Sequence, residues 1–390
     1  MKIEKLLSLI SDDLLVQLAL DTRVDHYAKK LQGEVIFKLL LYCIVSHKDN
    51  SLRTMESAYE KVAFKLLNQK YNQDSIRFSS ISERLSNINV AFFEKIYLNC
   101  INAYKKDLGN DGENLIRFDS TIIALSTRLL EIGYQLQGGN AEDFKQLKFT
   151  IGFSDIPEIV HFYHEQKYTS ENVALKQTIA KQAEIESKTI KVFDKGITAR
   201  NTYDEFTEKD IRFVTRLNTN ARHTTIRLND DSVFPLETST LTIVNDTWCY
   251  LYNSNKQRTK HPVRRIETIR IADNEPIVFI TNIHSLSAAE VTEIYKRRWD
   301  IEVFFKFIKQ LLNFKHLLNR SENGIKVVLY VTMIAAILLI AYKKTNHLKG
   351  FKIVKQKFEQ ELETIILKDL IVMCGGNPEL LGSILSKRSP

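Results

Sequence analysis

Four side chains suited to phosphate chemistry recur at helical spacing near residue 300. They are Tyr295, Arg298, Glu302 and Lys309, separated by three, four and seven residues. Because an α-helix turns by about 100° per residue, a continuous helix would carry all four on one face. Arginine holds a phosphate by two parallel hydrogen bonds, lysine adds a point charge, and a tyrosine hydroxyl donates to a phosphate oxygen. The alternative is an exposed amphipathic helix with ordinary charge pairs, which requires no particular residue at these positions.

Two aspartates upstream end short hydrophobic runs. One run ends in Asp119-Ser120-Thr121, and another ends in Asp194-Lys195-Gly196. Each motif alone is weak, because an aspartate at a strand end is often only a turn residue. Both motifs gain meaning from their order ahead of the helix motif.

The helix motif resembles the Y-(2)-R-(3)-E-(6)-K signature of the IS4-type (DDE) insertion-sequence transposases, and it is met at all four positions. The Asp119 and Asp194 motifs resemble the family's DST-like and D-R-G-Y motifs, in the required order. The sequence departs from the second motif, with Lys195 in place of arginine and Ile197 in place of tyrosine. The carboxylate and the glycine turn are kept, so only local DNA contacts are expected to differ. The resemblance covers roughly residues 114 to 340.

The resemblance implies that Asp119, Asp194 and Glu302 are catalytic and hold two Mg²⁺ ions, with Mn²⁺ as a substitute. Two such ions about 3.5–4 Å apart act on the attacking and the leaving oxygen of a phosphodiester. Mg²⁺ takes hard oxygen ligands such as carboxylates. The same resemblance implies that Tyr295, Arg298 and Lys309 grip the transposon end.

Further residues are candidates for DNA contact. Trp299 is expected to stack on a base exposed in a distorted DNA end, or else to pack half-buried. The basic run from Lys256 to Arg270 includes Arg264 and Arg265 and is expected to contact phosphates without reading sequence; its alternative is a solvated hairpin tip. Some family members use an insertion tryptophan to receive a flipped base, and Trp248 lies in the corresponding region, with its role open.

The segments that position these residues change character along the chain. Residues 1–108 contain no proline, and their apolar residues recur at helical spacing, which predicts helices. Arg53, Arg77 and Arg84 on these helices indicate either a helix-turn-helix-like DNA reader or a plain helical bundle. Between residues 114 and 217, β-branched and aromatic runs surround one helical stretch, which is typical of an α/β domain.

From about residue 218 to 283 the runs indicate antiparallel strands. Ser287 and Glu290 then form a capping-box pattern that predicts one helix to about Leu312. About 108 residues separate Asp194 from Glu302. The resemblance implies that a β-rich insertion fills this interval.

The fold class expected is α/β: a ribonuclease-H-like catalytic core with a β-rich insertion, flanked by helical N- and C-terminal regions. The expected segments are 1–108 (helical, DNA-binding), 109–217 (first part of the core), 218–285 (β insertion), 286–345 (remainder of the core) and 346–390 (C-terminal helices).

Composition narrows the class of protein. With 44% hydrophobic and 26% charged residues the chain is globular and not disordered. A net charge of +8 favours a polyanionic partner. Four scattered cysteines lack the spacing of a zinc site and indicate reduced thiols in a cytosolic protein. The apolar run Val327–Tyr342, at about 16 residues, falls short of the roughly 20 that cross a bilayer and predicts a buried core helix.

The resemblance implies a DNA transposase that cuts transposon ends and joins them to target DNA by phosphodiester hydrolysis and transesterification. Its partners would be double-stranded DNA with terminal inverted repeats, target DNA, and a second copy of the chain when two ends are paired. The expected location is the bacterial cytoplasm, at the nucleoid during action. The alternatives are a metal-dependent nuclease without strand transfer, and a DNA-binding protein with an unused site. A third alternative, a peripheral membrane protein, is supported only by the net charge and the apolar run.

Overall fold

The computed structural model describes residues 3–28, 30–47, 50–68, 75–108, 114–126, 132–135, 144–229, 234–314 and 317–381. The chain forms two compact units. The helical unit comprises Met1–Gly109, Leu129–Ile132 and Lys306–Pro390, and the sheet unit comprises Asn110–Arg128 and Gly133–Phe305.

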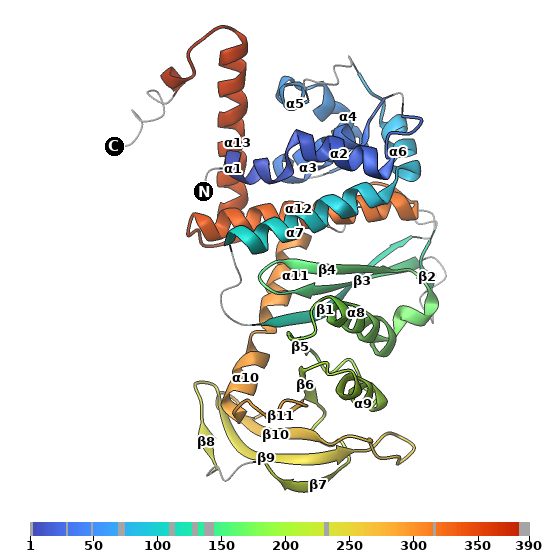
Figure 1. The fold of residues 1–390 in the computed structure, drawn as a ribbon, viewed down its shortest axis with the longest axis vertical. Coiled ribbons are helices and arrows are strands. Elements are labelled where there is room, and N and C mark those ends of the chain that lie inside the picture. Colours follow the sequence, from blue (N-terminus) through green and yellow to red (C-terminus); the bar gives the residue numbers. More distant parts are fainter. Residues whose placement is uncertain are drawn as a thin grey trace. The chain divides into compact units, whose positions relative to one another are not determined.

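The helical unit is built around one apolar helix (Figure 1). Its elements are α1 (Ile3–Leu7), η1 (Ser8–Ile10), α2 (Asp12–Thr22), α3 (Gly33–Ser46), α4 (Leu52–Glu60), α5 (Val62–Leu67), α6 (Phe78–Asn87), α7 (Val90–Leu108), α12 (Glu322–Thr345) and α13 (Phe351–Met373). Helix α12 packs against α3, α6, α7 and α13 and is buried along most of its length, which explains its apolar sequence. Among the described residues it is the helix long and apolar enough to cross a membrane, yet 89% of that stretch is buried inside the protein. The predicted core helix is confirmed.

The three arginines of the N-terminal helices differ in their surroundings. Arg84 is built into the unit, where it donates to the carbonyl oxygens of Val24 (2.7 Å) and Leu31 (3.0 Å). Arg77 is 82% exposed, and Arg53 lies over the ring of Phe78. A role of these helices in reading DNA stays a prediction.

The sheet unit is a mixed α/β structure around one sheet of eleven strands (Figure 1). Its strands are β1 (Leu115–Ser126), β2 (Tyr134–Gln135), β3 (Phe144–Phe153), β4 (Pro157–Tyr163), β5 (Ile190–Phe193), β6 (Phe213–Leu217), β7 (His223–Leu228), β8 (Leu236–Glu237), β9 (Leu241–Leu251), β10 (Val263–Arg270) and β11 (Pro276–Thr281). Its helices are α8 (Glu171–Ile185), α9 (Asn201–Glu208), α10 (Ala288–Lys296) and the start of α11 (Trp299–Leu311), with a short turn η3 (Gln166–Thr169).

The strand order is β2-β3-β1-β5-β6-β11-β10-β9-β7, with β4 on β3 and β8 on β9. Strands β1, β5 and β6 are parallel, and the remaining pairs are antiparallel. Antiparallel strands therefore lie where the sequence predicted them after residue 218. They continue the same sheet, because β11 pairs with β6.

Two apolar clusters cover the two faces of this sheet. One contains side chains of α8 and α9 with Ile116 and Phe118 of β1. The other contains side chains of α10 with Leu115 of β1 and Val192 of β5. Alternate residues of β1 thus face opposite helical layers, as the two-residue period of a strand requires.

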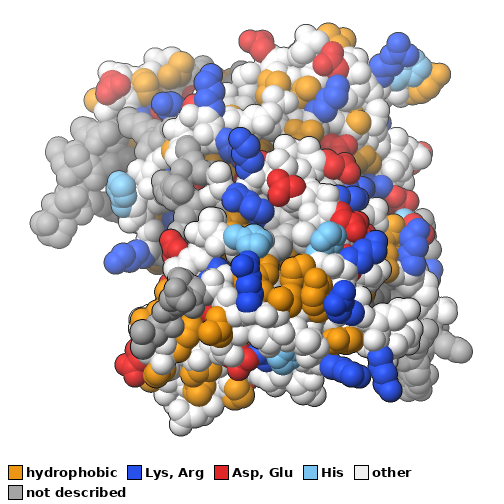
Figure 2. Space-filling view, turned by 60° about the horizontal axis from the view of Figure 1, so that its bottom comes forward, with side chains coloured by type: hydrophobic (Ala, Val, Ile, Leu, Met, Phe, Trp, Pro, Cys, Tyr) orange, Lys and Arg blue, Asp and Glu red, His pale blue; other side chains and the backbone are white. Residues whose placement is uncertain are grey.

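The far edge of the sheet is strand β7, most of which is exposed. Ile226 and Leu228 are 49% and 67% exposed there. Figure 2 brings this end of the unit forward and shows hydrophobic side chains gathered among Lys and Arg side chains.

The boundary between the units falls inside α11, between Phe305 and Lys306. We expected residues 286–345 to complete the catalytic core, but α12 lies in the helical unit. The reason is the nearly continuous apolar surface of α12, which needs helices on all sides.

Candidate active site

Asp119 and Asp194 lie on neighbouring strands of the sheet. Asp119 lies within β1, which continues to Ser126 and does not end at Thr121 as expected, and Asp194 directly follows β5. Strands β1 and β5 pair in parallel up to the residues immediately before Asp119 and Asp194. Leu115 and Val192 pack beneath α10, and alternation places both aspartates on that same face. The sheet therefore brings together two carboxylates that are distant in the sequence.

The helix motif is divided between two helices, and the prediction of one continuous helix is wrong. Tyr295 lies on α10, Arg298 in the turn after it, and Glu302 on α11. In the turn the hydrogen bonds tighten to three-residue spacing: Arg298 N–H donates to Tyr295 O (2.9 Å), and Asp300 N–H donates to Arg297 O (3.1 Å). The predicted capping box of Ser287 and Glu290 is confirmed at the start of α10.

Arg117 fixes this turn against the sheet. Arg117 precedes Asp119 by two positions on β1, and only 1% of its surface is exposed. Its Nε donates to the carbonyl oxygen of Arg297 (2.9 Å), and another nitrogen donates to that of Ser154 (2.6 Å). Its third nitrogen lies 3.0 Å from Asp300 Oδ2. This arginine therefore holds the start of α11 next to the strand of Asp119.

Burial of its carboxyl group raises the pKa of Asp119 to about 6. Burial contributes most, and the negative charges of Glu171 and Glu302 add to it. The backbone N–H of Ser120, which donates to Asp119 Oδ1 at 2.8 Å, and the guanidinium of Arg298 act in the opposite direction. Asp119, Glu302 and Arg298 thus share one electrostatic environment.

The motif residues already contact the other two carboxylates. The hydroxyl of Tyr295 donates to Asp194 Oδ1 at 3.0 Å, and burial together with this carboxylate raises the pKa of Tyr295. The Arg298 guanidinium forms an ion pair with Glu302. The Arg298 side chain is 14% exposed, so its charge lies inside the site and not in bulk solvent.

The donors at this site suit a hard cation by their chemistry. Within the described part of the chain, no three His, Cys, Asp or Glu side chains are grouped closely enough to hold an ion. Instead, Arg298 supplies the positive charge beside Glu302 and Asp119. The carboxylates offer only oxygen ligands, and a bound divalent cation would offset the burial and the repulsion that together raise the pKa of Asp119.

Sequence reasoning missed two residues of this region, Arg117 and Glu171. Glu171 accepts from Ser120 Oγ (3.0 Å) and from the buried ammonium of Lys148 (2.8 Å). A Cβ built on Gly196 would meet Glu171 at 3.2 Å, so Glu171 lies between the two aspartate motifs. The available signal for Arg117 was a charged residue inside an otherwise hydrophobic strand.

Trp299 and Lys309 both lie on α11 but differ in how far their side chains are exposed. Trp299 is the first residue of α11 and is 62% exposed. Lys309 is half-buried, in the part of α11 that belongs to the helical unit. Trp299 therefore offers an open ring, and the DNA-binding roles of both residues remain proposals.

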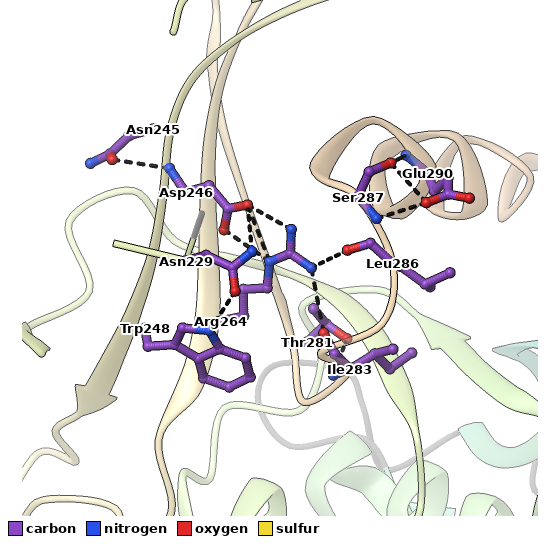
Figure 3. A network of polar contacts seen from close by, with 10 residues as sticks. All are labelled: Asn229, Asn245, Asp246, Trp248, Arg264, Thr281, Ile283, Leu286, Ser287 and Glu290. Carbon is purple, nitrogen blue, oxygen red and sulfur yellow. Dashed lines mark hydrogen bonds and ion pairs between the residues drawn. The ribbon is translucent and has the colours of Figure 1, made fainter. Parts of the chain in front are cut away.

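The structure places the two arginines of the insertion inside the protein. Arg264 is 1% exposed and forms a bidentate pair with Asp246, at 2.9 Å from Nε to Oδ1 and 2.6 Å from Nη2 to Oδ2 (Figure 3). It also donates to the carbonyl oxygen of Leu286, just before α10. Arg265 is 4% exposed and pairs with Glu267. Because both charges are buried and already neutralised, neither arginine is placed to contact a DNA phosphate.

Trp248 belongs to the same buried network (Figure 3). It is 3% exposed, its Nε1 donates to Asn229 Oδ1 at 2.6 Å, and its ring stacks on His284 with centroids 4.1 Å apart. The ring thus packs inside the sheet unit, against His284, and presents no open face to a base.

Comparison with known proteins agrees with the motif order. The model of the family described as "Transposase DDE domain" matches residues 111–340. The chain is 28% identical over 239 residues to "Putative transposase y4zB" of Sinorhizobium fredii, covering 61% of this chain and 64% of that protein. It is 31% identical over 137 residues to "Probable transposase for insertion sequence element IS5377" of Geobacillus stearothermophilus, covering 35% and 34%.

A third relative is matched over a longer stretch. It is "Putative transposase for insertion sequence element IS4SA" of Synechocystis sp., 24% identical over 314 residues and covering 76% of this chain and 78% of that protein. The family match spans the strand of Asp119, the loop of Asp194 and the helix of Glu302. The chain therefore belongs to the transposase DDE domain family, and its motifs are those of an IS4-type insertion-sequence transposase.

Proposed function

We propose that this protein cuts the ends of an insertion sequence and joins them to target DNA, with Asp119, Asp194 and Glu302 as its catalytic carboxylates. The observation that supports this proposal is that one guanidinium, that of Arg298, interacts electrostatically with all three carboxylates. Asp119 and Asp194 come from adjacent parallel strands, and Glu302 is electrostatically coupled to Asp119. The motif residues Tyr295 and Arg298 contact Asp194 and Glu302, respectively.

The arrangement of the first strands supports a ribonuclease-H-like core. Strand β3 pairs antiparallel with β1, and β1, β5 and β6 follow in parallel. Helices α8 and α9 make the crossovers before β5 and β6. In this arrangement Asp119 lies on a central strand, where a neighbouring strand end and α11 can both reach it.

The chain's own residues would prepare the site for a phosphodiester. When bound by the three carboxylates, two Mg²⁺ ions (or Mn²⁺) would supply activation of the attacking oxygen and stabilisation of the leaving oxygen. Arg298 can exchange Glu302 for a DNA phosphate, which is also a bidentate acceptor. That exchange would free the Glu302 carboxylate as the DNA binds, while Tyr295 keeps Asp194 oriented. Lys309 would add a positive charge, and Trp299 would stack on an exposed base.

The substrate proposed is double-stranded DNA with terminal inverted repeats, together with target DNA. Joining two ends requires two active sites, so we propose a homodimer on paired ends. The protein would act at the bacterial nucleoid.

The test is cleavage and strand transfer on an oligonucleotide duplex that carries the element's terminal inverted repeat. Asp119→Asn should abolish both reactions, because it removes a charged ligand at nearly constant shape, and should leave DNA binding within about twofold. Asp273→Asn is the matched control, since Asp273 is 50% exposed in the turn between β10 and β11.

The outcomes separate the proposal from its rivals. Unchanged cleavage by Asp119→Asn would overturn the assignment of the site. Cleavage by the wild-type protein without any joined product would indicate a nuclease. Binding of the duplex without cleavage at any Mg²⁺ or Mn²⁺ concentration would indicate a DNA-binding protein with an unused site.

A further inference from the structure

A polar cavity of about 580 Å³ lies in the sheet unit beside the loop that leads on from Asp194. The loop contributes Arg200 and Asn201, and the hairpin between β9 and β10 contributes Tyr252 and Gln257, among others. The lining contains no acidic residue. The cavity therefore offers hydrogen-bond donors and the positive charge of Arg200, on the segment that follows Asp194 in the chain.

Two arginines at this hairpin lie against tyrosine rings. The Arg222 guanidinium lies over the ring of Tyr252 at 5.1 Å, and that of Arg258 over the ring of Tyr250 at 4.0 Å. A guanidinium held by its face on a ring keeps the N–H groups of its edge available for an anion. Both arginines are exposed, as is Lys256 at the tip of the hairpin.

The acids of helix α9 have partners other than these cations. Asp204 accepts the backbone N–H of His261 in the hairpin at 2.9 Å. Glu205 pairs with a lysine of α8 at 2.6 Å, and Glu208 pairs with Lys260 of the hairpin at 3.4 Å. Glu208 therefore neutralises Lys260, while Lys256 and Arg258 of the same hairpin keep their charges.

The result is a concentration of positive charge without counter-ions. Among the described residues, Arg200, Arg222, Lys256 and Arg258 form no ion pair with a carboxylate. The hairpin itself is held in shape, because Asn253 exchanges two hydrogen bonds with Gln257 (2.9 and 3.0 Å). A polyanion with regularly spaced charges fits such a rigid, acid-free surface.

We propose that this surface, the hairpin groove (Arg200, Arg222, Tyr252, Lys256 and Arg258), binds the phosphodiester backbone of a DNA duplex. The proposal rests on the function proposed above, because it places DNA beside Asp194. Guanidinium and amide donors would contact phosphates and fix the register of the duplex without reading its sequence. The duplex could be the transposon end, the flanking DNA beyond it, or the target; all three present the same backbone.

The experiment measures the salt dependence of DNA binding by fluorescence anisotropy, with the full chain. The variant Arg222→Gln/Lys256→Gln/Arg258→Gln removes three charges, and the slope of log K against log salt should become shallower by about 0.9 for each phosphate that the variant no longer neutralises. Arg222→Lys/Arg258→Lys keeps the charges and should keep the wild-type slope. The matched control is Arg270→Gln, because Arg270 lies on the same insertion but is already paired with Asp273.

Three duplexes separate the sources of the backbone: a terminal repeat alone, the repeat with flanking DNA, and an unrelated sequence. A shallower slope on all three identifies a general backbone contact, and one confined to the flanked duplex identifies the flank. An unchanged slope on every duplex, in a variant with the wild-type circular dichroism spectrum, would overturn the proposal.

The test also distinguishes this inference from the proposed function. If the hairpin groove is wrong but the function is right, the triple variant cleaves like the wild type and Asp119→Asn does not cleave. If the function is wrong but the hairpin groove is right, no protein cleaves and the triple variant still has a shallower slope.

Discussion

Replacing Arg117 with methionine should separate the two helices of the motif from the sheet. Arg117 is buried on β1 and connects that strand to the carbonyl oxygens of Ser154 and Arg297 and to Asp300. Methionine keeps much of the volume of the side chain but donates no hydrogen bond. The substitution would leave two carbonyl groups without this charged donor and would release the turn between α10 and α11.

The structure sets the size of the effect. A hydrogen bond from a charged group contributes about 1.5–3 kcal/mol, and two such bonds end on carbonyl groups of the sheet unit. The pair with Asp300 adds only about 0–1 kcal/mol, because Asp300 is 51% exposed. We therefore expect Arg117→Met to lower the free energy of unfolding of the sheet unit by about 3–7 kcal/mol.

Hydrogen exchange of the β1 and β5 amides measures the sheet unit directly, which matters because two units need not unfold together. Single-turnover cleavage should also slow at saturating DNA, with the dissociation constant for DNA nearly unchanged, because Arg117 positions α11 and is not proposed to touch the substrate. Asp300→Asn is the control and should cost less than about 1 kcal/mol. Equal protection in Arg117→Met and Asp300→Asn would refute the positioning role.

Three further outcomes follow from single contacts. Tyr295→Phe removes the hydrogen bond to Asp194 and should slow cleavage by about tenfold, measured at saturating DNA, with little change in the melting temperature. Asp246→Ala leaves the Arg264 guanidinium buried without its partner and should cost about 3–5 kcal/mol in urea unfolding, more than the double variant that also carries Arg264→Met. The pKa of His161 is lowered to about 4, by burial first and then by the charge of a nearby lysine. The unfolded chain binds a proton that the folded chain excludes between pH 6.5 and 4. Stability should therefore fall by about 3 kcal/mol as the pH drops through that window, relative to His161→Gln; equal pH profiles would contradict the burial.

The sequence was sufficient to predict those elements whose structure is determined by neighbouring residues in the chain. β-branched and aromatic runs predicted β1, β3, β4, β5 and β6, and a serine three residues before a glutamate predicted the capping box of α10. The motif residues could be assigned to one site because order and spacing along the chain carry that information. The register that puts Asp119 beside Asp194 follows once the two strands are known to be neighbours.

The sequence was insufficient where a distant residue decides the outcome. The helix after Ser287 breaks at a turn whose carbonyl group is bound by Arg117, about 180 positions earlier in the chain. Arg264 stands in a basic run that resembles a solvated hairpin, yet its acidic partner comes from the neighbouring strand β9. Neither partner is adjacent in sequence. The charge of Arg117 within a hydrophobic strand marks that residue as unusual, but periodicity and composition do not show which group it binds.

The joining of β11 to β6 has a mechanical consequence. Strand β11 pairs with β6 over four residue pairs, from Val278 with Leu217 to Thr281 with Val214. Strands β9 to β11 therefore belong to the same hydrogen-bonded sheet as β1 and β5. Moving the hairpin relative to β1 and β5 would require breaking the backbone hydrogen bonds between β6 and β11, which are neighbours in the middle of the sheet. The hairpin is therefore expected to keep a fixed position relative to β1. A duplex bound at the proposed hairpin groove would then reach the carboxylates without a closing motion of strands β9 to β11.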